Sequence, residues 1–233
     1  MTSAPRQIRT VAETGSTNDD LAILARDGAA EGLWLRAERQ TGGKGRQGRH
    51  WLSPAGNLYA STLVRLRPHD PAAPTLALVS AVALHEAASL YAPAVRIKWP
   101  NDLVAGGAKL AGILLEREGE AVVVGFGVNL AAHPDLPDRP ATSLAALAGS
   151  APDAPAFLEI LAESFARWLD RWRSKGLAPV RRSWLEAAHP VGTPLSTEAG
   201  RGLFDGLDED GALRLRLADG SVRVIHAGDI FLI

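Results

Sequence analysis

The chain of 233 residues contains no cysteine. Disulfides, thiolate metal sites and a cysteine nucleophile are therefore excluded, and a reducing, cytoplasmic setting is expected. Net charge is also nearly absent, at −1, so the surface as a whole does not attract nucleic acid or anionic membrane. No stretch is apolar enough to span a bilayer, and residues 1–9 lack the apolar segment of a signal peptide. We expect a soluble protein without membrane contact whose anionic ligands are small.

Two common kinds of active site are missing as well. The sequence has no Gly-x-Ser-x-Gly elbow, and its six histidines, at positions 50, 69, 85, 133, 189 and 226, show no metal-ligand spacing. The sequence therefore gives little support to a hydrolase or a metalloenzyme.

The most informative positive feature is a basic, glycine-rich segment between Gln40 and Trp51. It contains four glycines, at positions 42, 43, 45 and 48, together with Lys44, Arg46 and Arg49, and has no acidic residue. Glycines allow positive φ and leave backbone N–H groups open to a ligand, and arginines offer planar forks that suit phosphate or carboxylate oxygens. The segment predicts an anion-binding loop, with a solvated basic turn as the alternative.

The spacing Gly43-x-Gly45-x-x-Gly48 also fits the dinucleotide-binding fingerprint. That fingerprint needs a helix that opens at the third glycine and an acidic residue about 20 positions further on. Here Pro54 and Gly56 prevent such a helix, and no Asp or Glu occurs between Glu38 and Asp70. A nicotinamide-binding protein is therefore rejected, and the expectation of a phosphate-binding loop stays.

Hydrophobic periodicity predicts strands and helices that form a sheet backed by helices. The run Leu110–Leu115 does not alternate, so we expect that strand to be covered on both faces. Ser16 and Asp19 have the spacing of a capping box, and 131–155 has the composition of a surface connection. Strands are expected at 8–13, 33–38, 58–66, 109–117 and 121–130. One helix is expected to follow the turn at 14–19, and others at 75–91, 156–175 and 180–187.

After His189 the pattern changes to short strands with Gly-containing turns. Strands so close together make a small antiparallel barrel with little core of its own, which must pack on the main unit. The sequence thus predicts a larger domain over 1–187 and a small one over 188–233. The expected strands of the small domain are 198–201, 203–207, 213–217, 222–225 and 230–233.

Three other segments carry candidate ligand-binding residues. Ser16, Thr17 and Asn18 stand at a strand-to-helix turn, where free N–H groups favour a polar ligand, although the same residues are ordinary helix caps. The turn Lys98–Asp102 exposes polar side chains at a sheet rim. Lys109 begins an apolar strand in which Gly112 allows close approach of a ligand, and a plain surface lysine is the alternative.

Together these segments resemble the biotin-protein ligases, which attach biotin to carboxylase carrier domains. The resemblance implies an α+β fold with a mixed β-sheet backed by helices, as in a class II synthetase-like catalytic domain. The last strands resemble, more loosely, the family's small SH3-like domain. It is carried by Thr14–Asn18, Glu38–Pro54, Lys98–Asp102, Lys109–Glu116 and Gly125–Asn129, in the family's order.

The resemblance also implies a role for each matching residue. Hydrogen bonds to the ring end of biotin are implied for Ser16, Thr17, Asn18 and Gln40, and the pocket lining for Gly112, Leu114 and Gly125. Backbone contacts to the biotin carboxylate and the α-phosphate of ATP are implied for Gly43, Lys44 and Gly45. Nucleotide binding is implied for Lys44, Gly45, Arg46, Arg49, Trp51, Asn101, Asp102, Lys109 and Asn129, with Asp102 also serving Mg²⁺.

In the implied reaction the carboxylate of biotin attacks the α-phosphorus of ATP, and a carrier lysine then takes biotin from the adenylate. Two anions meet, so cations must converge on one spot, which agrees with catalytic roles for Lys109, Arg46 and Arg49. The glycines indicate that the loop moves and closes over the adenylate. Many family members carry Arg at the position of Lys44, and a lysine cannot make the same bidentate contact.

Some relatives carry an N-terminal DNA-binding domain, but here the first expected strand begins within ten residues of Met1. We therefore expect a ligase that binds no DNA and represses no gene. A lipoate-protein ligase and a non-catalytic biotin or nucleotide sensor are the alternatives. An exposed sheet edge is available for a homodimer, but no residue decides the oligomeric state.

Overall fold

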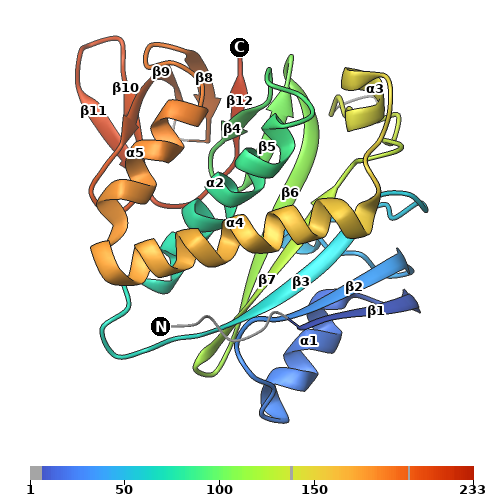
Figure 1. Ribbon diagram of the computed structural model, residues 1–233. Coiled ribbons are helices and arrows are strands. Elements are labelled where there is room, and N and C mark those ends of the chain that lie inside the picture. Colours follow the sequence, from blue (N-terminus) through green and yellow to red (C-terminus); the bar gives the residue numbers. More distant parts are fainter. Residues whose placement is uncertain (1–6, 137–138, 199) are drawn as a thin grey trace.

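The computed structural model describes residues 7–136, 139–198 and 200–233. Residues 1–6, part of the segment expected not to be a signal peptide, lie outside the described residues. A sheet of seven strands has the order β1-β2-β3-β7-β6-β5-β4 (Figure 1). Only β1 and β2 are parallel, joined through α1, and the other neighbours are antiparallel. The expected mixed sheet is confirmed. Its strands are β1 Gln7–Thr14, β2 Leu33–Gln40, β3 Leu58–Arg65, β4 Arg96–Lys98, β5 Asp102–Ala105, β6 Ala108–Glu118 and β7 Ala121–Val128.

Helices cover the two faces of this sheet unequally. On one face α2 and α4 bury the main core (Figure 1). In this core Trp34 stacks on Phe126 with ring centroids 5.6 Å apart, and Phe165 meets Trp34 edge-on. On the other face α1 covers only a smaller cluster with Leu33, Leu63 and others, so part of this face stays open. The helices are α1 Thr17–Arg26, α2 Leu76–Ser89, α3 Leu144–Ala148, α4 Ala154–Lys175 and α5 Leu177–Ala187.

The C-terminal strands form a separate five-stranded antiparallel sheet in the order β11-β10-β9-β8-β12. Its apolar side joins the main core, because Leu195, Phe204 and Leu213 belong to the same buried cluster as α2, α4 and α5. This agrees with the expected SH3-like unit, and the boundary between residues 187 and 188 stays a prediction. The strands are β8 Pro194–Thr197, β9 Gly200–Leu207, β10 Leu213–Arg216, β11 Val222–Ile225 and β12 Ile230–Leu232.

Several local expectations were wrong. Strand β8 was missed, and the expected strands 198–201 and 203–207 are, from residue 200 onward, the single strand β9. The connection 131–155 holds the short helix α3, which Ser143 caps by accepting from the N–H of Ala146. The strand expected to be covered on both faces, β6, leaves Gly112 and Leu114 only half-buried.

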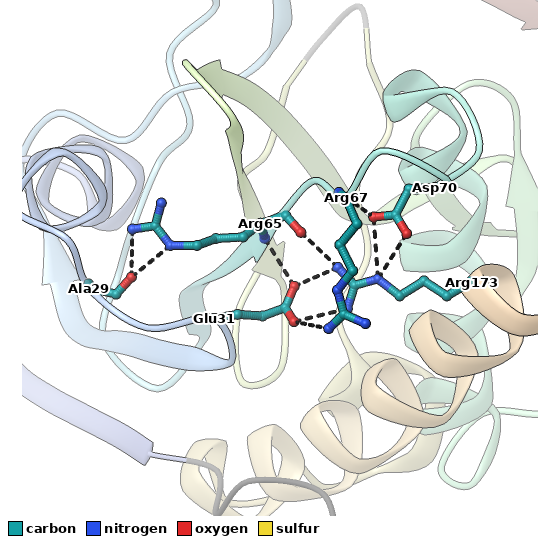
Figure 2. Close-up of polar contacts among 6 residues, drawn as sticks. All are labelled: Ala29, Glu31, Arg65, Arg67, Asp70 and Arg173. Carbon is teal, nitrogen blue, oxygen red and sulfur yellow. Dashed lines mark hydrogen bonds and ion pairs between the residues drawn. The ribbon is translucent and has the colours of Figure 1, made fainter.

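A charged cluster ties the end of β3 to α4, far along the chain (Figure 2). Arg173 contacts Glu31 at 2.6 Å and Asp70 at 3.3 Å, and it donates to the carbonyl of Arg65 at 2.8 Å. The Arg173 and Asp70 side chains are only 12% and 6% exposed. Because the guanidinium of Arg173 uses its donors in these contacts, it fixes α4 against the end of β3.

Among the described residues, no helix has the length and apolar character required to cross a membrane.

Candidate active site

The open part of the sheet face begins at the N-terminus of α1. The N–H of Thr17 donates to Gln40 Oε1 at 2.8 Å, and the Thr17 hydroxyl lies 2.7 Å from that of Ser61. Ser61 in turn donates to Asn18 Oδ1 at 2.6 Å, and Asn18 Nδ2 donates to Glu116 at 2.6 Å. This chain of hydrogen bonds fixes the orientation of each polar group before any ligand arrives.

Ser16 occupies the N-cap position of α1 but makes no capping hydrogen bond with its side chain. The expected capping box is therefore wrong. Ser16 is 4% exposed and has extended backbone, as an N-cap should. Because its hydroxyl is not used for capping, the side chain stays available to a ligand at this end of the face.

Glycines form the floor of the site. A Cβ at Gly125 would overlap the amide of Asn18, and a Cβ at Gly127 would come within 2.6 Å of the Trp51 indole. The ring of Trp51 also lies 3.3 Å from the Cβ position of Gly112. The indole therefore rests directly on the strand backbones. Within the part of the chain that the structure describes, its buried N–H has no hydrogen-bond partner, so it can donate to a ligand.

The glycine-rich loop forms a tight hairpin. Gly45 donates to the carbonyl of Arg49 at 2.7 Å, and Trp51 donates to that of Gly43 at 2.9 Å. Among the four glycines, which all allow positive φ, only Gly48 adopts it, beside Gln47 with φ 57°. Gly43 is needed for another reason, since a Cβ there would lie 2.6 Å from the Trp51 carbonyl.

The two loop arginines turn toward the C-terminal sheet. Arg49 lies 3.0 Å from Asp229, and Arg46 lies 3.5 Å from the same carboxylate and donates to Asn101 Oδ1 at 3.2 Å. Asn101 is itself held by donating to the carbonyl of Ile113 at 2.6 Å. Residues from three distant parts of the chain thus meet at one place.

Lys44 takes a different direction. Its ammonium lies 2.7 Å from both oxygens of Asp19 on α1, and both side chains are about half exposed. The N–H groups of Gly43 and Lys44 make no hydrogen bond to residues in the described ranges. In this arrangement the backbone of Lys44, and not its side chain, is free to face an anion.

Lys109 stands between the loop and the sheet rim. Its ammonium forms an ion pair with Asp102 Oδ1 at 2.7 Å, without the alignment of a hydrogen bond, and lies 5.6 Å from the centroid of the Trp51 ring. The Lys109 side chain is 37% exposed, so it can reach a ligand on this face. Asp102 keeps its second oxygen for another partner.

Asn129 is placed less favourably for its expected role. It is 2% exposed, and its amide donates to the carbonyl of Thr142 at 3.0 Å. The side chain therefore holds the connection before α3, and its oxygen is the atom left for a nucleotide.

Asp102, the expected Mg²⁺ ligand, has few other metal-binding side chains around it among the residues that the structure describes. No group of three or more His, Asp or Glu side chains able to hold a metal occurs in the described residues. Asp102 alone fits an ion that arrives with a nucleotide, because Mg²⁺ takes one or two carboxylates along with substrate phosphates.

Sequence reasoning missed several residues that the structure brings into the site: Ser61, Glu116, Gly127, Asp19 and Asp229. Glu116 and Gly127 lie inside the quoted motifs, so their position was a usable signal. Ser61 and Asp229 gave none, because Ser61 lies in a strand outside the motifs and Asp229 lies in the small C-terminal unit.

Comparison with known proteins agrees with this geometry. Residues 16–130 match the model of the "Biotin/lipoate A/B protein ligase family", and residues 195–233 match the "Biotin protein ligase C terminal domain". Fold and site thus define a ligase of the biotin and lipoate type.

Individual relatives indicate which ligases of this class the chain is similar to. The chain is 43% identical to a biotin--[acetyl-CoA-carboxylase] ligase of Paracoccus denitrificans, over 95% of this chain and 98% of that protein. It is 34% identical to a bifunctional ligase/repressor of Bacillus subtilis, over 93% of this chain and 71% of that one. A biotin protein ligase of Aquifex aeolicus, solved with biotin and ATP, superposes with a TM-score of 0.86 at 26% identity, covering 98% and 99% of the two chains. The chain belongs to the biotin protein ligase family.

Proposed function

We propose that this ligase forms biotinyl-adenylate from biotin and ATP and transfers biotin to a lysine on the carrier domain of acetyl-CoA carboxylase or a related carboxylase. The observation that carries the proposal is the 2.7 Å pair of Lys109 and Asp102 beside the Arg46–Arg49 loop, with the Asn18 network on the same sheet face. The relatives that act on biotin favour it over lipoate.

In the proposed first step the ring end of biotin binds the polar network of Thr17, Asn18 and Gln40 above Gly125. The carboxylate then lies toward Lys109 and the free N–H groups of Gly43 and Lys44. A carboxylate oxygen attacks the α-phosphorus, and pyrophosphate leaves with the bonding electrons. Fixed cations at Lys109, Arg46 and Arg49 offset the repulsion between the two anions, and each such contact contributes roughly 1.5–3 kcal/mol.

Mg²⁺ is proposed as the counter-ion of the triphosphate, and Asp102 as the protein carboxylate that holds it. When bound, the ion supplies charge neutralisation to the phosphates. In the second step the carrier amine attacks the acyl carbon, AMP leaves with the electron pair, and the amine loses its proton to solvent. Lys109 would stabilise the developing charge in both steps.

The test is biotin transfer to a purified carrier domain by wild type and by Lys109→Ala. Loss of a cation at the reacting centre is expected to lower kcat by about 10²- to 10³-fold. Lys175→Ala, which removes an exposed lysine at the end of α4, is the matched control and should be unchanged. The proposal fails if wild type labels no carrier domain, as a sensor would, or if lipoate supports pyrophosphate exchange better than biotin.

We also propose that the protein acts in the cytoplasm and represses no gene. The lack of cysteine agrees with a reducing compartment, and the net charge of −1 provides no overall attraction to DNA phosphates. Specific retention on operator DNA at physiological salt would contradict it.

A further inference from the structure

Lys98 is a residue of the Lys98–Asp102 motif to which the proposed mechanism gives no role. It is the last residue of β4, it pairs in register with Asp102 of β5, and it is partly buried. Its ammonium makes no hydrogen bond or ion pair within the usual distances to a residue that the structure describes. The ammonium lies over the ring of Phe231 on β12, 5.6 Å from the ring centroid. A partly buried ammonium without an acceptor is costly unless an anion joins it.

The charges around Lys98 do not supply that anion. Burial lowers the pKa of Lys98, Lys109 and Arg49 lower it further, and Asp102 and Asp229 oppose them. Both carboxylates are already engaged, Asp102 with Lys109 at 2.7 Å and Asp229 with Arg49 at 3.0 Å. Four cationic side chains gather around these two carboxylates, namely Lys98, Lys109, Arg46 and Arg49. The group therefore has two more positive than negative charges.

The order of the strands shows how these cations are arranged across the sheet. Gly125 of β7 lies at the biotin end, Lys109 of β6 comes next, and Lys98 of β4 lies beyond β5 at the sheet edge. In phosphoryl-type transfer the attacking and leaving oxygens lie roughly in line across the phosphorus. If the carboxylate approaches from the side of β7, the leaving group points toward β4.

We propose that Lys98 binds the β- and γ-phosphates of ATP and stabilises them as they leave as pyrophosphate. This inference rests on the proposed function and extends its site by one residue. The ammonium donates hydrogen bonds to the leaving oxygens, no proton is transferred, and the electrons of the broken P–O bond stay on pyrophosphate. Once pyrophosphate has left, Lys98 has no part in the transfer of biotin to the carrier lysine.

Measuring the two half-reactions separately therefore distinguishes binding of the leaving phosphates by Lys98 from a purely structural role. In Lys98→Met, kcat/KM for ATP in biotin-dependent pyrophosphate exchange is expected to fall roughly tenfold to hundredfold, the range for one lost charge-assisted hydrogen bond. Transfer from chemically prepared biotinyl-adenylate to a carrier domain should stay within about twofold of wild type. Lys98→Arg, which keeps the charge, should recover part of the exchange activity.

Arg96→Met is the matched control, because Arg96 is an exposed cation on the same strand, and both assays should be unchanged. Equal losses in exchange and transfer by Lys98→Met and by Lys98→Gln would overturn the inference in favour of a structural role. Normal exchange by Lys98→Met would overturn it as well. If wild type itself shows no biotin-dependent exchange, the proposed function fails and not the assignment of Lys98 alone.

Discussion

Asp229 lies 3.0 Å from Arg49, and this contact joins the edge of the C-terminal sheet to the glycine-rich loop of the main unit. The same carboxylate is 3.5 Å from Arg46, and the carbonyl of Gly228 accepts from Arg46 at 3.4 Å. The small C-terminal unit therefore restrains the two residues expected to hold phosphates. Its contribution to the site is electrostatic as well as structural.

The first prediction concerns how firmly this contact holds the loop. Without the carboxylate, Arg46 and Arg49 lose their shared partner, so Asp229→Ala should be cut by trypsin within residues 44–49 several-fold faster than wild type. Asp219→Ala removes an exposed carboxylate from the same unit and should not change the rate. Biotin and ATP together should slow cleavage of wild type, because the loop is proposed to close over the adenylate. Equal rates for wild type and Asp229→Ala would show that Asp229 does not restrain the loop.

The second prediction concerns the floor of the biotin pocket. A methyl group at Gly125 would overlap the amide of Asn18 and displace it from Ser61 and Glu116. Loss of one or two aligned hydrogen bonds should raise the Kd for biotin by roughly 10- to 100-fold, measured by titration calorimetry. Gly15→Ala is the control, because nothing lies within 4 Å of its Cβ position. Unchanged affinity in Gly125→Ala would exclude Asn18 from biotin binding.

The third prediction decides how Lys44 acts. Its side chain pairs with Asp19 at the surface, and an exposed pair of this kind contributes only about 0–1 kcal/mol. Lys44→Ala should therefore change KM for ATP less than about fivefold, whereas Arg46→Ala should raise it at least tenfold. Steady-state kinetics with both variants gives the comparison. A loss in Lys44→Ala as large as in Arg46→Ala would mean that the lysine side chain reaches the nucleotide.

Much of the fold was predictable because it depends on periodicity. The helical spacing of Phe165 and Trp168 correctly placed α4 in the core, and alternation with turn signals located most strands. The short strands β5 and β8 were missed, because four residues carry too little pattern to stand out from turns.

The site was predictable where the motifs carry its chemistry and not where partners come from distant segments. Lys109 lies 5.6 Å from the centroid of the Trp51 ring, and Arg46 of the glycine-rich loop donates to Asn101, so residues of the predicted motifs do contact one another. Ser61 and Asp229 act only through contacts with residues 43 and 180 positions away, and no local pattern records such contacts. The capping box failed for a related reason, since Ser16 has capping geometry but its side chain makes no capping bond.

The last prediction concerns stability and pH at the cluster of Glu31, Arg173 and Asp70 (Figure 2). Burial by itself raises the pKa of Glu31, but hydrogen bonds from Arg173 and from the N–H of Arg65 outweigh it and hold the pKa below the usual 4.5. A carboxyl with a depressed pKa stabilises the fold fully above its unfolded pKa and loses that contribution as pH falls through the folded value.

Glu31→Gln should therefore reduce the free energy of unfolding at pH 7 by about 1–3 kcal/mol, measured by urea denaturation. The difference from wild type should begin to shrink as pH falls below about 4.5, where Glu31 of the unfolded chain takes up a proton, and should disappear once pH is below the depressed pKa of the folded protein. Glu120→Gln is the control, since its carboxylate is 82% exposed and lies 4.0 Å from Arg117, a pair that contributes little. A Glu31→Gln difference that stayed constant from pH 7 to pH 3 would show that packing of the side chain, and not its charge, stabilises the junction of β3 and α4.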